Sequence, residues 1–147
     1  MRDEISFVWP AAGAMQVTSL PGGGCNVKIM FADRGIVRSI GKGWILKVRN
    51  ISTRRIARQY EIIIRHDGGF ESSYTIVDQT PHLAAGEASV LPTLGTFVED
   101  GGELYAIRNG GFLHFQLFRG GKLVDPRNFI PPEFDGTIDT SSQSPDT

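Results

Sequence analysis

The sequence predicts an all-β fold, and within that class an antiparallel β-sandwich. The chain has 147 residues, of which 18 are glycine, and most glycines stand in doublets or a triplet. Short segments rich in β-branched and aromatic residues lie between these glycines, and no segment has a strong helical pattern. Many short strands joined by glycine turns are typical of a sandwich, with a jelly roll or small barrel as the alternative.

The glycine clusters are predicted to be turns. They stand at residues 22–24, 68–69, 101–102, 110–111 and 120–121. Three of them follow Asp67, Asp100 and Asn109, and Asp-Gly or Asn-Gly pairs tolerate the positive φ angles of tight hairpin turns. We therefore expect hairpins at these places.

About eight strands are expected between the turns. Residues 5–9 and 36–40 are weak candidates, and the stronger ones are 26–31, 44–50, 70–77, 87–91, 103–108 and 112–119. The last two, followed by the short segment 122–124, are predicted to form a C-terminal β-meander. In residues 44–50 the side chains alternate, so that Trp44, Leu46 and Val48 share one face. This alternation predicts that Trp44 lies in the core.

One segment, residues 52–67, fits two periodicities. Ile56, Tyr60, Ile63 and Ile64 match a helix, whereas Ile56, Tyr60, Ile62 and Ile64 match a strand. We favour the strand because three consecutive isoleucines are poor helix formers, and because the Asp67 turn then leads into the next strand as a hairpin.

The chain is predicted to hold one sandwich domain, residues 1–130, followed by an extended C-terminal tail, residues 131–147. Its length suits a single core, which at this size needs neither disulfides nor a structural metal. The tail is polar and contains prolines. The single Cys25 rules out an internal disulfide. Neither a signal peptide nor a transmembrane segment is recognised, so we expect a soluble protein, in a virion or the cytoplasm.

Part of the pattern resembles immunoglobulin-like or fibronectin-like sandwich domains. The segments are WILKVRNIS, IARQYEIIIRHDGG and LAAGEASVL, within residues 44–91. The inter-sheet cysteine pair of antibody domains is missing. The resemblance implies a fold and carries over no functional residue.

Charge is divided into two blocks along the chain. Residues 34–65 hold nine Lys and Arg and one Glu, whereas residues 66–107 hold seven Asp and Glu and no Lys or Arg. Either the two blocks neutralise each other side by side across a sheet, or they form opposite patches that bind a protein partner or a second copy. The partner-binding residues predicted from this second interpretation are Lys47, Arg49, Arg54, Arg55, Arg58, Glu99, Asp100 and Glu103.

Signals for other chemistry are weaker. Residues 52–58 are basic enough for nucleic acid, but the acidic half would repel phosphate. The carboxylates at 99–103 lack the alternating ligands of a calcium loop, and His66, His82 and His114, which we interpret as surface or sheet-face residues, lack metal-ligand spacing. Neither Cys25 nor Ser52, Ser72 and Ser73 stands in a nucleophile motif. A carbohydrate-binding surface would use Trp9 and Tyr105, if both are exposed.

These observations together predict a non-catalytic, protein-binding structural or accessory subunit of a larger assembly, for example a phage virion. We predict no enzymatic activity, no cofactor, no metal and no membrane partner. The alternatives are a carbohydrate-binding module and a small hydrolase.

Overall fold

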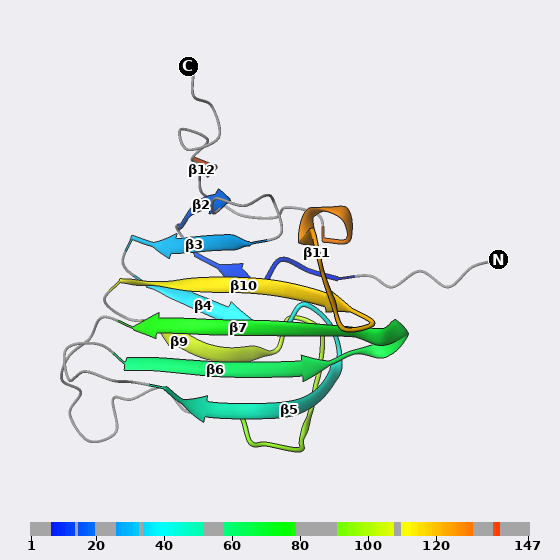
Figure 1. Cartoon of the computed structure of the whole chain (residues 1–147). Coiled ribbons are helices and arrows are strands. Elements are labelled where there is room, and N and C mark those ends of the chain that lie inside the picture. Colours follow the sequence, from blue (N-terminus) through cyan, green and yellow to red (C-terminus); the bar gives the residue numbers. More distant parts are fainter. Residues whose placement is uncertain are drawn as a thin grey trace.

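The computed structural model describes residues 7–13, 15–19, 26–32, 34–51, 58–78, 91–107, 110–130 and 137–138. Its strands form a large and a small sheet that pack face to face, so the predicted β-sandwich is confirmed (Figure 1). The described part also contains two single-turn 3-10 helices, η1 (Asp67–Gly69) and η2 (Pro126–Asn128). No helix in it is long and apolar enough to cross a membrane.

The large sheet has the order β12-β2-β3-β10-β7-β6-β5-β8, and β11 pairs with β10 off this path. All its pairs are antiparallel except that of β12 with β2. Its strands are β2 (Met15–Ser19), β3 (Val27–Phe31), β5 (Gly43–Asn50), β6 (Arg58–Arg65), β7 (Phe70–Asp78), β8 (Phe97–Val98), β10 (Gly111–Arg119), β11 (Lys122–Val124) and β12 (Thr137–Ile138). The small sheet has the order β1-β4-β9, with β1 (Ala11–Ala12), β4 (Gly35–Arg38) and β9 (Glu103–Ile107).

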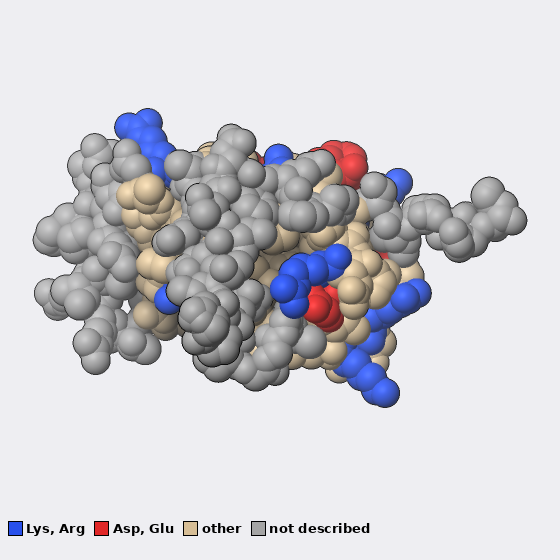
Figure 2. Space-filling model, turned by 90° about the horizontal axis from the view of Figure 1, so that it is seen from above, with Lys and Arg blue, Asp and Glu red and all other residues tan. Residues whose placement is uncertain are grey.

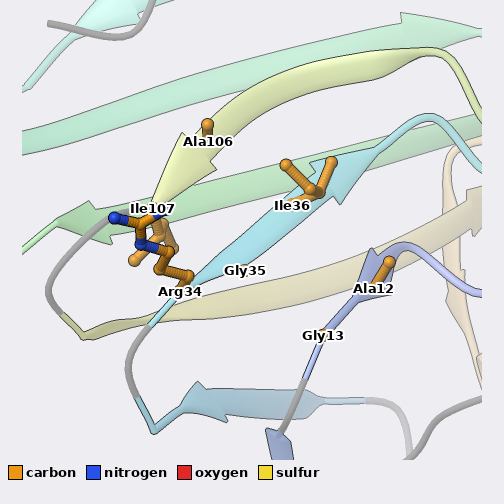
Figure 3. Close-up of a pocket in the computed structure, with 7 residues that line it drawn as sticks. All are labelled: Ala12, Gly13, Arg34, Gly35, Ile36, Ala106 and Ile107. Carbon is orange, nitrogen blue, oxygen red and sulfur yellow. The ribbon is translucent and has the colours of Figure 1, made fainter. Parts of the chain in front are cut away.

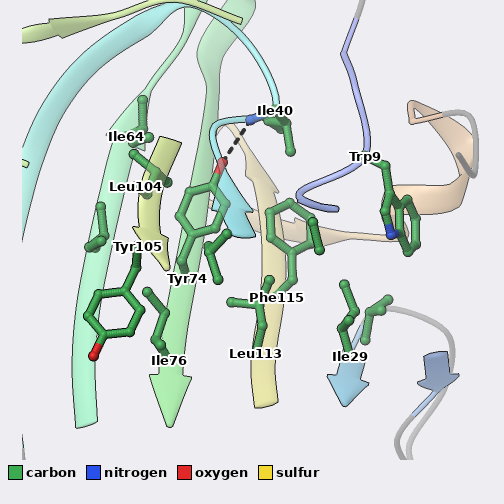
Figure 4. Close-up of a cluster of buried hydrophobic side chains, with 14 of the residues drawn as sticks. Trp9, Ile29, Ile40, Ile64, Tyr74, Ile76, Leu104, Tyr105, Leu113 and Phe115 are labelled. Atoms are coloured by element: carbon green, nitrogen blue, oxygen red, sulfur yellow. Dashed lines mark hydrogen bonds between the residues drawn. The ribbon is translucent and has the colours of Figure 1, made fainter. Parts of the chain in front are cut away.

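The core lies between the sheets because alternate side chains of β6, β7 and β10 point inward. Ile62, Tyr74 and Phe115 form one inward row across these three strands. The small sheet contributes Leu104 and Tyr105 (Figure 4). A core of this kind is held by burial of apolar surface.

The predicted C-terminal meander is wrong in its first half. Strand β9 pairs with β4 of the small sheet, whereas β10 lies between β3 and β7 of the large sheet. The chain between them therefore crosses from one sheet to the other. The second half of the predicted meander, the hairpin of β10 and β11, is confirmed, since Arg119 pairs with Lys122.

Most of the other strands form where they were predicted. Residues 58–65 form a strand, and the turn at 67–69 joins it to β7 as a hairpin, with Gly68 at φ +76°. Residues 7–9 of the weak candidate 5–9 form no strand, and 87–90 lie outside the described residues. Strands β1, β2 and β8 were not predicted. The resemblance to immunoglobulin-like domains stays a prediction.

Two residues of the predicted tail, Thr137 and Ile138, pair in parallel with Gln16 and Val17 of β2. This pair places part of the C-terminal region at the end of the large sheet opposite β8 (Figure 1). The remainder of residues 131–147 lies outside the described residues.

The crossing into β10 explains why two glycines follow Asn109. Gly110 has φ +84° and an added Cβ would come no closer than 3.8 Å to another residue, at Phe31 O, whereas Gly111 has φ +150° and a Cβ there would lie 2.3 Å from the carbonyl oxygen of Val77. Gly110→Ala should therefore cost about 1 kcal/mol of unfolding free energy from backbone strain alone. Gly111→Ala should cost about 3 kcal/mol, because a backbone collision adds to the strain.

Urea denaturation measures both losses, and Gly101→Ala is the matched control because Gly101 has φ +73° with no atom within 4 Å of the added Cβ. Equal losses at 110 and 111 would contradict the close approach of β10 to β7.

Candidate functional site

The structure places the predicted basic residues in different surroundings. Lys47 and Arg49 are exposed on β5, and Arg49 Nη2 lies 2.8 Å from Oε1 of Glu61 on β6. Arg58 is partly buried at the start of β6, opposite Asp78 of β7. Its Nε has no hydrogen-bond partner among the described residues. Arg54 and Arg55 lie outside the described residues.

The predicted acidic residues are all exposed. Glu99 and Asp100 lie in the turn between β8 and β9, and Glu103 begins β9 opposite Arg38. The eight predicted partner-binding residues do not form one cluster, because those described lie on β5, on β6, in the β8–β9 turn and on β9.

The two charge blocks lie side by side in several places. Arg65 of β6 is the cross-strand partner of Glu71 of β7, as Arg58 is of Asp78. Figure 2 shows Lys and Arg atoms at separate places on the visible described surface, with Asp and Glu atoms beside some of them. This face therefore carries mixed charge.

A break in the regular register of β5 puts Trp44 on the surface, so its predicted core position is wrong. The register against β6 shifts between Ile45 and Lys47, which leaves Leu46 as an extra residue. Ile45 is buried in the core, whereas Trp44 is 54% exposed and Leu46 38% exposed. The bulge thus presents two large apolar side chains to solvent.

Strand β8 and the segment before it add two more exposed apolar side chains beside them. Phe97 is the cross-strand partner of Trp44, and their ring centroids are 5.1 Å apart with the planes at 69°. The segment before β8 also docks on β5, since Gly95 N–H donates to Ile45 O (2.9 Å). This bond brings Leu94, which is 59% exposed, alongside the bulge.

We define Trp44, Leu46, Leu94 and Phe97 as the apolar edge. They are four of the six exposed large apolar side chains among the described residues, and they gather at one edge of the large sheet. Exposed charged residues adjoin the group in the chain, since Lys47 follows Leu46 on β5 and Glu99 follows Val98 of β8. Monomeric soluble proteins rarely expose an apolar cluster with a polar rim unless it binds something.

A recess of about 250 Å³ opens next to the apolar edge. Trp44 and Phe97 line it together with the charged residues Lys42, Arg65 and Asp67. Gly43 at its base is required for close pairing, because a Cβ there would lie 2.3 Å from Arg65 O. The recess therefore offers an apolar wall and charges of both signs.

A second pocket, of about 530 Å³, lies on the small sheet (Figure 3). Ala12, Ile36 and Ala106 are neighbours on β1, β4 and β9 and line it. Arg34 is the charged side chain of its described lining. The pocket suits an apolar group with a negative end, and its described lining includes no acid, base or nucleophile for catalysis.

A serine and a histidine come together inside the core. His66 Nδ1 donates to Lys42 O (2.9 Å), and Nε2 lies 2.7 Å from Ser72 Oγ, so the serine hydroxyl donates to Nε2. His66, interpreted from the sequence as a surface or sheet-face residue, is buried, and that interpretation is wrong. Ser72 is fully buried, so its hydroxyl is not exposed to a substrate, whereas His66 also lines the recess beside Trp44 and Phe97.

The aromatic residues considered for carbohydrate are buried. Trp9 is 3% exposed and Tyr105 is 1% exposed. The Tyr105 hydroxyl donates to Asp78 Oδ2, and burial followed by this bond raises the pKa of Tyr105. Neither ring is available to a sugar.

The described residues contain no group of three or more His, Cys, Asp or Glu side chains that could hold a metal ion. Cys25, Ser52 and His82 lie outside them. His114 is half-buried on a sheet face, as interpreted from the sequence. The sequence matches no protein-family model and no curated protein.

The buried His66 should make stability fall on acidification. Burial lowers its pKa below 6.5, so the unfolded chain binds the proton first as the pH drops. The stabilisation is present above about pH 6.5 and is lost as the pH falls below that value. Burial lowers the pKa of His114 as well, which adds a contribution of the same sign.

Urea unfolding at about pH 7.5, 6.5 and 5.5 measures this loss. His66→Gln should reduce the pH dependence more than the matched variant His114→Gln does, because His66 is the more buried of the two. An unchanged pH dependence in His66→Gln would contradict the prediction.

Proposed function

We propose that the protein is a non-catalytic, protein-binding subunit of a larger assembly, such as a virion, and that it binds its partner through the apolar edge. The observation that carries this proposal is the gathering of Trp44, Leu46, Leu94 and Phe97 at one sheet edge. Each exposed apolar side chain alone needs no explanation, but four of them at one sheet edge, two of them in ring contact, favour a binding surface.

The composition of the apolar edge supports a protein partner. Protein interfaces are enriched in aromatic residues at their centre and carry polar residues at the rim, and Trp is prominent among residues whose truncation costs most binding energy. Here Trp44 and Phe97 are in ring contact, and the charged residues Lys42, Arg65 and Asp67 line the recess with them.

The backbone at this edge adds a second argument. Strand β8 has only two residues and is the last strand of the large sheet on that side. An open edge attracts further strands, and proteins usually protect it with charge or cover it. A protein partner would cover both the apolar side chains and the open edge.

The two alternatives have less support. Trp44 and Phe97 meet edge to face, so they form no flat platform on which a sugar ring stacks. A hydrolase would need an accessible nucleophile, and Ser72, the serine bonded to His66, is fully buried. We therefore propose no second function.

Substitutions in the apolar edge should abolish partner binding while the fold remains. We expect Trp44→Ser and Phe97→Ser each to weaken binding at least about tenfold, because central aromatic residues contribute about 2 kcal/mol or more to an interface. Native mass spectrometry of the tagged protein isolated from its source reports the complex, and titration with the identified partner gives the affinity.

Leu123→Ser and Met30→Ser are the matched controls, since both side chains are apolar and exposed but lie outside the apolar edge. Complexes that survive both edge substitutions, or that are lost equally in the controls, would argue against this surface.

A further inference from the structure

Charged residues at the two ends of the apolar edge have opposite signs. Glu99 and Asp100, which we call the acidic turn, follow β8 directly, and Gly43 of β5 is paired with Val98 at that end. Lys47 lies further along β5, beyond the bulge. Lys42 precedes Gly43 at the acidic end, so that end carries both signs with an excess of negative charge, whereas the other end carries Lys47.

The two charged ends are separate enough to act independently. The bulge makes Leu46 and Lys47 together advance one step along β6, so Lys47 lies three steps from Gly43, about 10 Å at 3.3 Å per residue. This exceeds the screening length of about 8 Å at physiological salt. Lys47 belongs to no ion pair among the described residues, whereas Arg49 is held by Glu61. Lys42, Arg65 and Asp67 surround the recess and contribute both signs there.

The peptide N–H and C=O of Phe97 are directed away from β5. Ile45 N–H donates to Thr96 O (2.9 Å), so the neighbouring pair of Trp44 and Phe97 is of the non-hydrogen-bonded type. In such a pair the peptide N–H and C=O are directed to the outer side of the strand. Phe97 thus offers one donor and one acceptor at the open edge.

We propose that the partner at this edge is a second copy of the chain, bound across a two-fold axis at Phe97. In this dimer the two β8 strands run antiparallel, and the acidic turn of each copy meets Lys47 of the other. The inference rests on the proposed function and names its partner.

Antiparallel pairing about Phe97 brings the right groups together. The acidic turn follows β8 and the turn that holds Leu94 precedes it, so antiparallel β8 strands bring the acidic turn of one copy toward the Leu94 turn of the other. Leu94 lies alongside the bulge, next to which Lys47 stands. The same rotation places Phe97 of one copy beside Phe97 of the other on one face of the joined sheet.

Charge favours a second copy over an unrelated partner. A negative end and a positive end on one edge are complementary to the same edge after a two-fold rotation, as an isologous interface requires. The net charge of −1 also leaves little repulsion between two copies.

A charge exchange tests the arrangement directly. One variant is Lys47→Glu and the other is Glu99→Lys with Asp100→Lys, and sedimentation velocity measures association of each alone and of their equimolar mixture. Alone, each variant sets like charges against each other twice in the dimer, so we expect dissociation constants at least about tenfold above the parent's. In the mixed dimer both contacts are attractive, so association should return to within about threefold of the parent.

Lys122→Glu is the control, because it makes the same change on β11, outside the edge. Dimers of the parent and of the mixture, with monomers of each separate variant, support the proposal, and recovery in the mixture also shows that both variants fold. A mixture that forms chains longer than two would overturn the two-fold axis. Association unchanged by either variant would overturn the charge pairing.

The test also separates this inference from the proposed function. A parent that stays monomeric at about 100 μM, well above the range of stable dimers, while Trp44→Ser abolishes binding of a different protein, overturns the self-pairing and leaves the proposed function standing. If edge substitutions change neither self-association nor any complex, both are wrong.

Discussion

One buried hydrogen bond fixes the chain where it passes from the small sheet to the large one. Tyr74 lies at the middle of β7, fully buried, and its hydroxyl accepts from the backbone N–H of Ile40, 3.0 Å away, in the connection that leads from β4 of the small sheet to β5 of the large one (Figure 4). A buried N–H without a partner is costly, so this bond fixes the path of the crossing chain. Burial also raises the pKa of Tyr74 to about 12, which keeps the hydroxyl neutral. The crossing leads directly to Gly43 and Trp44, and so the position of the apolar edge follows from it.

Much of the fold could be predicted from the sequence because its signals are local. Alternation of isoleucines identifies β6, and Asp-Gly identifies the turn into β7. The partner of β9 could not be predicted, since a glycine turn has the same appearance whether it closes a hairpin or carries the chain to another sheet. Burial of His66, Trp9 and Tyr105 likewise depends on contacts between distant segments.

Of the candidate site, only the charged residues could be predicted from the sequence. The two blocks of opposite sign are visible in the sequence, but their meeting at one edge depends on β8 lying next to β5. A strand of two residues is too short to give a periodic signal, and the bulge at Leu46 reverses the face on which alternation places Trp44. The apolar side chains of the site were therefore assigned to the core or left unassigned.

The short strand β12 ends the described part of the large sheet on the side opposite β8. A sheet with two open edges is a template for continued addition at both ends, as in fibrils. Here Thr137 and Ile138 pair with two residues of β2, so the chain's own C-terminal region occupies part of the edge opposite β8. In the proposed dimer the second copy occupies the β8 edge, so growth of the large sheet on that side would stop at two copies.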